Sequence, residues 1–230
     1  MESKLKPSLP TNRPAPLASE AEIQSAYQGR QAAGDYVQRR FTSELMLLLH
    51  DRQVAAVNRI MRKHAPGRTL EIAPGPGRVT RDVRPAGELI CLEFNEGMIA
   101  EGQAACQNGA VWQQGNAFEL PFANEFDLIY SYRFVRHFHR EDRNRLYAGI
   151  RAALRPGGRF VMDAVNQQVS ERLRQANPDN YPIYDKLYID REELRTELAE
   201  AGFEAVQCEP VLRWYRRQYQ AQVLLGPRSQ

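Results

Sequence analysis

The sequence predicts an α/β fold in which helices cover both faces of a parallel β-sheet. Short apolar runs alternate with helical segments between residues 69 and 165. A glycine-rich turn, Ala-Pro-Gly-Pro-Gly-Arg at 73–78, follows the first apolar run, and Glu93 ends the second. A glycine turn after one strand and a carboxylate at the end of the next are typical of α/β sheets that bind a nucleoside.

Length and composition favour a single soluble domain. The chain has 230 residues, of which 43% are hydrophobic and 26% charged, which is ordinary for a globular protein. We expect a cytoplasmic protein, because no apolar run approaches the roughly 20 residues of a membrane span and the N-terminus lacks a signal-type apolar core. The net charge of +3 is too small to indicate nucleic acid, and the three cysteines show no metal-ligand spacing.

The N-terminal part of the chain divides into a tail and a helical region. Residues 1–19 hold four prolines and no periodic apolar pattern, which predicts a disordered or loosely draped tail. A capping box at 19–22 begins a short helix, and an apolar stripe predicts a longer helix over 43–63. Pro66 and Gly67 end that helix.

Strands and helices alternate after this region. The expected strands cover 69–72, 89–93, 111–114, 126–130 and 159–165. A short helix is expected after Gly77, and two further helices are expected over 95–107 and 142–154. An irregular stretch at 166–189 precedes a helix capped by Asp190 and two strands at 203–211 and 215–225. Because the last two strands are too close for a crossover helix, we expect them to be antiparallel.

Five segments in a fixed order resemble signatures of one family. They are Leu-Glu-Ile-Ala-Pro-Gly-Pro-Gly-Arg at 70–78, Leu-Glu-Phe-Asn-Glu-Gly-Met at 92–98, Gly-Asn-Ala-Phe-Glu-Leu-Pro-Phe at 115–122, Phe-Asp-Leu-Ile-Tyr-Ser at 126–131 and Leu-Arg-Pro-Gly-Gly-Arg-Phe-Val at 154–161. The chain resembles the class I S-adenosylmethionine-dependent methyltransferases, in particular the small-molecule branch with the ubiquinone/menaquinone-biosynthesis enzymes.

This resemblance implies a Rossmann-like class I methyltransferase sheet with strand order 3-2-1-4-5-7-6 and strand 7 antiparallel. It implies a helical lid at 20–66 and a methyltransferase domain at 67–226. The expected cofactor is S-adenosyl-L-methionine, with S-adenosyl-L-homocysteine as its product. The cofactor would lie across the C-terminal ends of strands 1 to 4.

The glycine turn would hold the methionyl part and the ribose of the cofactor. The resemblance places the backbone of Ala73 and Gly75 against these groups, while Gly77 lets the following helix pack closely. Ala73 departs from the family's usual glycine, and its methyl group is tolerable unless the turn needs a positive φ. Glu71 would organise the loop or meet the cofactor's ammonium through water. The alternative for Glu71 is a satisfied carboxylate at a strand end.

The nucleoside would meet residues that follow the second and third strands. Glu93 has two acceptor oxygens, which can take both ribose hydroxyls. Phe94 would lie along the adenine, and Met98 would either reach the other side of the ring or belong to the core. Asn116 stands where the family commonly has aspartate, and its amide oxygen can still accept from the adenine amino group.

Further contacts to the cofactor are implied on both sides of its sulfonium. Ala117 would offer its backbone N–H to the adenine, and Phe118 would pack on the ring. Ser131 and Tyr132 follow the fourth strand, where the main chain meets the methionyl amino group and opens onto the acceptor.

The lid would add Tyr36 over the sulfonium and Arg40 at the cofactor carboxylate; a solvated basic helix face is the alternative for both residues. His137 is the candidate catalytic residue, because an imidazole can take a proton from a hydroxyl acceptor near neutral pH. The alternative is a histidine that holds a helix end in place. A base is optional, since methyl transfer is an in-line displacement on an already activated sulfonium.

The sequence leaves the methyl acceptor and the oligomeric state open. Tyr181, Tyr184 and Tyr188 suggest an aromatic acceptor pocket. The main hypothesis is methyl transfer to oxygen or carbon of a small organic molecule; sugars, glycans and natural-product intermediates remain open. A catalytically silent cofactor-binding protein and a nicotinamide-dependent oxidoreductase are the rivals. The basic run at 213–217 is explained more simply by a strand than by nucleic acid, and no Asn/Asp-Pro-Pro-Tyr/Phe segment is present.

Overall fold

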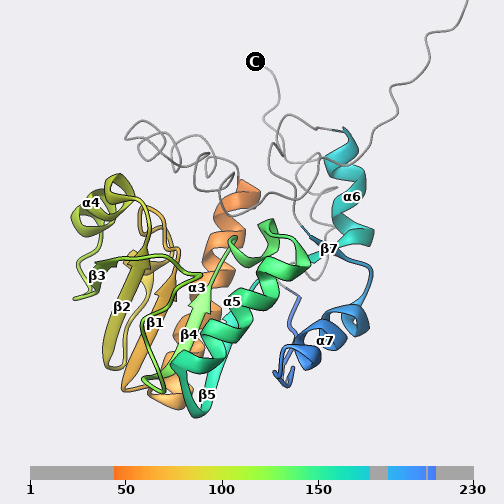
Figure 1. The fold of residues 1–230 in the computed structure, drawn as a ribbon. Coiled ribbons are helices and arrows are strands. Elements are labelled where there is room, and N and C mark those ends of the chain that lie inside the picture. The colour runs from red at the N-terminus through yellow and green to blue at the C-terminus, as the bar shows by residue number, and fades with distance from the viewer. Residues whose placement is uncertain (1–43, 177–185, 206, 211–230) are drawn as a thin grey trace, which may run out of the picture.

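A computed structural model of the chain describes residues 44–176, 186–205 and 207–210. Its centre is a five-stranded sheet in the order β3-β2-β1-β4-β5, and every neighbouring pair is parallel (Figure 1). The strands are β1 (Arg68–Ile72), β2 (Glu88–Glu93), β3 (Val111–Gln114), β4 (Phe126–Ser131) and β5 (Leu154–Met162). The predicted α/β class and the order 3-2-1-4-5 are therefore confirmed.

The central strands β1, β2 and β4 are buried along most of their length because helices cover both faces of the sheet. Leu70 and Leu92 point to the face covered by α5 (Arg140–Ala153). The residues beside them in sequence, such as Leu89 and Cys91, point to the opposite face, which α3 (Glu44–His64) covers with Val57 and Met61 (Figure 1). Parallel sheets buried on both sides need such continuous apolar runs.

Hydrogen bonds beyond the strand ladders join the carboxyl ends of the three central strands. The backbone N–H of Ala73, just past β1, donates to the carbonyl of Leu92 in β2 (2.9 Å). The hydroxyl of Ser131, the last residue of β4, donates to the carbonyl of Ile72 (2.9 Å). The loops after β1, β2 and β4 therefore leave the sheet at one edge, where sites of open α/β sheets form.

The helices around the sheet confirm two predicted caps. Asn95 precedes α4 (Glu96–Ala105) and its side chain accepts from the backbone N–H of Met98. Asp190 precedes α7 (Arg191–Glu200) and accepts from the backbone N–H groups of Glu192 and Glu193. Both are N-cap contacts, which satisfy donors that a helix start leaves unpaired.

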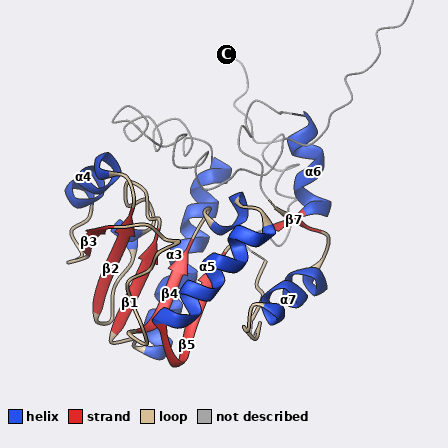
Figure 2. Cartoon of the chain, in the orientation of Figure 1, coloured by secondary structure: helices blue, strands red, loops and turns tan. Residues whose placement is uncertain are grey.

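The short helix expected after Gly77 is the 3-10 helix η1 (Thr80–Asp82). Two other local predictions were wrong. The stretch expected to be irregular contains the helix α6 (Gln167–Ala176), which Figure 2 shows. It also contains most of two short strands, β6 (Val165–Asn166) and β7 (Leu187–Tyr188), which pair in parallel. Residues 203–205 and 207–210 form no strand, although one was expected at 203–211.

The sequence did carry a signal for the missed helix α6. Its few apolar residues, Val169, Leu173 and Ala176, recur at helical spacing among polar ones, which is typical of an amphipathic helix. The predicted tail at 1–19, the lid up to residue 43 and the last strand at 215–225 lie outside the described residues. The antiparallel strand 7 therefore stays a prediction.

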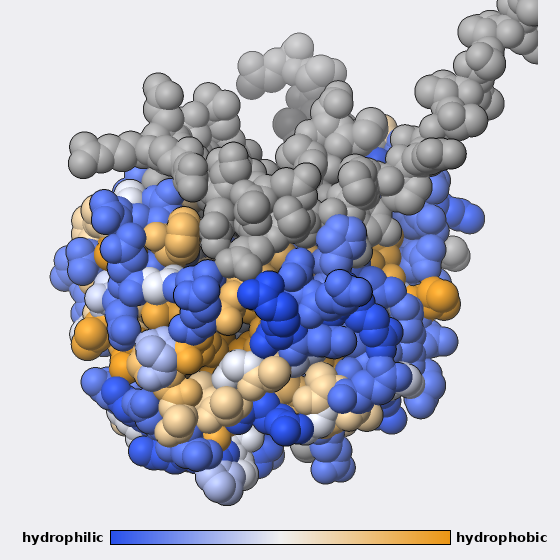
Figure 3. All heavy atoms as spheres, in the orientation of Figure 1, coloured by the Kyte–Doolittle hydropathy of each residue, from blue (hydrophilic) through white to orange (hydrophobic). Residues whose placement is uncertain are grey.

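The surface is mostly polar on the side shown in Figure 3, with apolar side chains gathered toward its middle. Among the described residues, none of the helices combines the length and the apolar character needed to cross a membrane.

Candidate active site

A cavity of about 1060 Å³, including its open mouth, lies at the carboxyl edge of the sheet. Its walls come from the loops that follow β1, β2, β3 and β4. It brings together the predicted residues Glu71, Ala73, Gly75, Glu93, Phe94, Met98, Asn116, Ala117, Phe118, Tyr132 and His137. The predicted residues Tyr36 and Arg40 lie outside the described residues.

Two predicted residues support the cavity from behind rather than line it. Ser131 is buried, and its hydroxyl is bound to the carbonyl of Ile72. Gly77 has φ +75°, and a Cβ there would lie 2.7 Å from the sulfur of Cys106, just past α4. Glycine at this position therefore allows the close packing that was expected of it.

The glycine turn needs the left-handed backbone at its first position as well. Ala73 has φ +53° and Gly75 has φ +60°. From the sequence, an alanine was expected to be unfavourable here if φ were positive, and φ is positive. The methyl group of Ala73 therefore destabilises the turn by about 1 kcal/mol. The turn holds this strain because Ala73 is also hydrogen-bonded to Leu92.

Glu93 is tied into the turn by its carboxylate. One oxygen accepts from the backbone N–H of Gly75, and the other accepts from those of Phe94 and Asn95, all at 3.0 Å. Burial raises the pKa of Glu93, and the three hydrogen bonds act in the opposite direction. Since a carboxylate has about four acceptor sites, little capacity is left for two ribose hydroxyls unless the Gly75 contact gives way.

Glu71 is a buried carboxylate under the turn. The hydroxyls of Thr80 and Tyr130 both donate to the same oxygen, each at 2.7 Å. Burial raises the pKa of Glu71 to about 7, although the two hydroxyls and the nearby Arg78 favour the charged form. These contacts match the satisfied strand-end carboxylate that was the alternative for this residue, and they place it at the cavity wall.

The side of the cavity next to β2 and β3 is mainly apolar. Phe94 is 41% exposed at its mouth, whereas Met98 is almost fully buried. The amide oxygen of Asn116 accepts from the backbone N–H of Phe118 (3.0 Å) and so shapes the loop after β3. An amide oxygen has a second lone pair, so Asn116 can also accept from a ligand.

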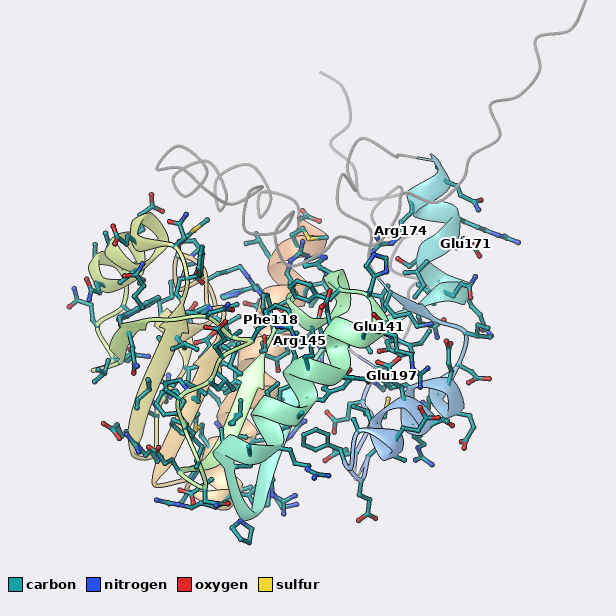
Figure 4. The ribbon with its side chains drawn as sticks, in the orientation of Figure 1. Phe118, Glu141, Arg145, Glu171, Arg174 and Glu197 are labelled. Atoms are coloured by element: carbon teal, nitrogen blue, oxygen red, sulfur yellow. The ribbon has the colours of Figure 1, made fainter. Side chains whose placement is uncertain are left out.

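The ring of Phe118 is fixed by its neighbours. It meets the ring of Phe138 edge to face, with centroids 5.1 Å apart. The guanidinium carbon of Arg145, on α5, lies over the Phe118 ring, 4.9 Å from its centroid (Figure 4). A cation over an aromatic face is attracted to it, so Phe118 forms a firm wall rather than a loose flap.

The loop after β4 forms the opposite wall. Tyr132 lines the cavity here, and the side chain of His137 is buried beside it. The backbone N–H of His137 donates to the carbonyl of Phe134 and closes the short 3-10 helix η2 (Val135–His137). His137 therefore both ends a helical turn and lines the cavity, so both predicted roles stay possible.

Arg78 is a cavity residue that the sequence reasoning did not single out. It is only 5% exposed, and its guanidinium donates to Gln53 (2.7 Å) and to Nδ1 of His50 (3.1 Å), both on α3. Because a guanidinium only donates, His50 must accept at Nδ1 and donate from Nε2 to Asp82 (2.9 Å). Burial and the charge of Arg78 lower the pKa of His50 accordingly. The one feature of the sequence that could have identified Arg78 is its position directly after Gly77.

One acceptor-pocket prediction fails. Tyr188 was expected to line that pocket, but it is buried away from the cavity, and its hydroxyl donates to Glu197 (2.9 Å). Glu197 forms a buried, bidentate ion pair with Arg143 of α5 (2.6 and 2.7 Å), which joins α7 to the core. Tyr181 and Tyr184 lie outside the described residues.

Comparisons with known proteins agree with this architecture. Residues 69–158 match the profile of a methyltransferase domain. The chain is 28% identical over 156 residues to the biotin biosynthesis bifunctional protein BioHC of Cellvibrio japonicus, covering 66% of this chain and 30% of that protein. It is 26% identical over 170 residues to the ubiquinone/menaquinone biosynthesis C-methyltransferase UbiE of Pectobacterium atrosepticum, covering 60% of this chain and 67% of that protein.

Among solved structures, magnesium protoporphyrin IX methyltransferase from Synechocystis PCC 6803, with bound S-adenosylhomocysteine, superposes with a TM-score of 0.63. The identity is 14%, and the match covers 81% of this chain and 90% of that one, which shows a common fold. The matched domain and these relatives support a class I S-adenosylmethionine-dependent methyltransferase that resembles UbiE. Its cofactor is accordingly S-adenosyl-L-methionine. The matched region spans about two thirds of UbiE and less than a third of BioHC.

The cavity of this methyltransferase fits that cofactor. It offers a carboxylate at the end of β2, apolar lining that includes Met98 and Phe118, and backbone groups of the glycine turn. These are the acceptor, the ring-binding surface and the close main-chain approach that an adenosine with a charged amino-acid tail requires.

Proposed function

We propose that the protein transfers a methyl group from S-adenosyl-L-methionine to an oxygen or carbon atom of a small organic molecule. The observation that carries this proposal is the cavity itself, which joins the glycine turn and Glu93 to the wall after β4. UbiE, a C-methyltransferase of ubiquinone and menaquinone biosynthesis, supports a small acceptor. The acceptor atom and its identity are the open parts of the proposal.

In this proposal the adenosine lies over β2 and β3. Glu93 accepts one ribose hydroxyl directly and a second one when the Gly75 N–H turns to the ligand. The adenine enters the slot between Phe94, Met98 and Phe118, with Asn116 and the backbone of Ala117 at its edge. The apolar lining of this slot and the exposure of Phe94 at its mouth support this orientation.

The methionyl end then lies between the glycine turn and the loop after β4. We propose that Arg78 meets the cofactor carboxylate there, a role that the resemblance implied for Arg40. Arg78 is buried, lines the cavity and is held in place by Gln53 and His50. Arginine matches a carboxylate with paired N–H donors.

Arg78→Gln should weaken the binding of S-adenosylhomocysteine by about 2 kcal/mol, as expected for a lost charged hydrogen bond. The affinity for 5′-methylthioadenosine, which lacks the amino-acid part, should not change. Calorimetry with both ligands tests this and also shows that the variant is folded. Equal losses for the two ligands would contradict the assignment.

The cofactor supplies a sulfonium-bound methyl group that a nucleophile can displace in line. The protein's part is then to align the acceptor and exclude water, since alignment alone can lower such a barrier strongly. Tyr132 and Phe138 wall the space, and His137 is placed to take up a proton from a neutral acceptor. An acceptor that is already ionised would not need it.

The direct experiment uses cofactor with an isotopically labelled methyl group. The protein is incubated with a panel of phenols, quinols, carboxylic acids and sugars, and labelled products are identified by mass spectrometry. Transfer to any of these small molecules supports the proposal. Cofactor binding without transfer to any acceptor would favour the catalytically silent alternative. The predicted cytoplasmic location, the absence of a nucleic-acid partner and the domain boundaries stay predictions.

A further inference from the structure

The wall of the cavity after β4 contains a strained turn. Arg133 lies between Tyr132 and Phe134, and all three residues line the cavity. The backbone of Arg133 is left-handed, with φ +60°. Residues other than glycine seldom adopt this conformation unless surrounding contacts hold them there, and such residues are common at binding sites. The position of this wall therefore depends on the contacts that hold the turn.

Asp163, the residue directly after β5, contacts the turn through its carboxylate. One oxygen accepts from the backbone N–H of Arg133 (2.6 Å), and the other accepts from the guanidinium of Arg136 (3.0 Å). The side chains of Asp163 and Arg136 are 12% and 10% exposed, so salt and water screen this ion pair little. A buried carboxylate thus connects both ends of the segment 133–136 to the end of β5.

The far end of the same loop has other anchors. The backbone N–H of Lys186, just before β7, donates to the carbonyl of Arg136 (2.7 Å). The guanidinium of Arg143, on α5, donates to the carbonyl of Phe138 (2.7 Å). Both contacts lie beyond the turn at Arg133, so removal of the Asp163 carboxylate should displace the start of the loop more than its end.

Asp163 acts on the cavity from behind its wall. It is not among the residues that line the cavity. Burial raises the pKa of the Tyr132 hydroxyl, and the charge of Asp163 raises it further. The carboxylate is therefore close to the wall, but it can affect a bound acceptor only through the loop.

We propose that Asp163 is a positioning residue for methyl transfer. By holding the turn at Arg133, it sets the places of Tyr132 and Phe134 on the acceptor's side of the cavity, and so aligns the acceptor with the cofactor's methyl group. Small displacements of reacting groups slow such a transfer strongly. This inference rests on the proposed methyl transfer, because it concerns the wall that the acceptor meets.

The test measures methyl transfer and cofactor binding in the same variants. The acceptor is the compound of the labelled-cofactor panel that the wild type methylates fastest. Asp163→Asn keeps the shape of the side chain and loses its charge, whereas Asp163→Ala loses both contacts. We expect kcat to fall about tenfold in Asp163→Asn and further in Asp163→Ala. The affinity for S-adenosylhomocysteine, measured by calorimetry, should stay close to that of the wild type, which also shows that the variants are folded.

Asp127→Asn is the matched control. Asp127, in β4, also accepts from a backbone N–H and from a guanidinium, those of Arg68 and Arg155 (both 2.9 Å), but it does not line the cavity. This variant should keep the kcat of the wild type, even if its unfolding temperature falls as far as that of Asp163→Asn.

Three results would overturn the inference. They are an unchanged kcat in both Asp163 variants, an equal loss of kcat in Asp127→Asn, and a loss of S-adenosylhomocysteine affinity as large as the loss of kcat. Absence of transfer by the wild type to every compound of the panel would instead overturn the proposed function, on which this inference rests.

Discussion

Replacing Glu93 by alanine tests the nucleoside site most sharply. The carboxylate holds Gly75 of the turn and the backbone of Phe94 and Asn95. Its removal deprives the ribose of an acceptor and loosens the turn at once. Since a hydrogen bond to a charged group is worth about 1.5–3 kcal/mol, we expect a loss of about 2 kcal/mol in binding free energy, or about 30-fold in the dissociation constant.

The assay is calorimetric titration of S-adenosylhomocysteine into wild type and Glu93→Ala. Glu96→Ala is the matched control, because Glu96 is an exposed carboxylate in the first turn of α4 that does not line the cavity. It should bind the ligand as the wild type does. Unchanged affinity in Glu93→Ala, or an equal loss in the control, would refute the reasoning.

A ligand analogue separates direct contact with the ribose from support of the turn. S-adenosylhomocysteine without its two ribose hydroxyls should bind the wild type much more weakly than the parent ligand does. In Glu93→Ala the same change in the ligand should matter little, because the acceptor is gone already. If both proteins lose the same free energy, Glu93 acts only through the turn.

Three further changes test the fold around the cavity. The pKa of Glu71 in the folded protein, about 7, is above its ordinary value of 4.5, so the stabilisation from its proton is lost as pH rises through 7. In urea titrations the wild type should lose roughly 3 kcal/mol of unfolding free energy between pH 4.5 and 8 relative to Glu71→Gln. Parallel pH profiles of the two proteins would contradict this. Ala73→Gly relieves the left-handed strain and should raise the free energy of unfolding by about 0.5–1 kcal/mol, after the gain in unfolded-chain entropy; a lower value would contradict it. Arg143→Met leaves Glu197 buried without its ion-pair partner and should lower the free energy of unfolding by about 3–5 kcal/mol. The double variant Arg143→Met/Glu197→Leu should recover much of this loss. An equal loss in the double variant would contradict the reasoning.

The central sheet could be predicted from the sequence because its signals are local. Continuous apolar runs such as that ending at Glu93 mark doubly buried strands, and the intervening helices force the parallel pairing. The N-caps at Asn95 and Asp190 could also be predicted, because a short polar side chain before a helix usually accepts from the first backbone N–H groups of that helix. These signals need no knowledge of distant parts of the chain.

The rest depends on contacts between distant parts of the chain. The sequence shows an alanine at position 73 but not that its φ is positive, and it shows Glu93 but not that three backbone groups already occupy it. The burial of Arg78 depends on its hydrogen bond to Gln53 of α3, a contact that the sequence does not show. Tyr188 was assigned wrongly to the acceptor pocket because its contact with Glu197 depends on how α7 packs. The spacing of residues in the sequence does not show that contact.

The most direct test of the central claim is the binding of S-adenosylhomocysteine compared with that of NAD(H), followed by calorimetry and by the shift of the unfolding temperature. The account predicts saturable binding of S-adenosylhomocysteine at one site per chain, with a raised unfolding temperature, and no effect of NAD(H). Stabilisation by NAD(H) without any response to S-adenosylhomocysteine would contradict it.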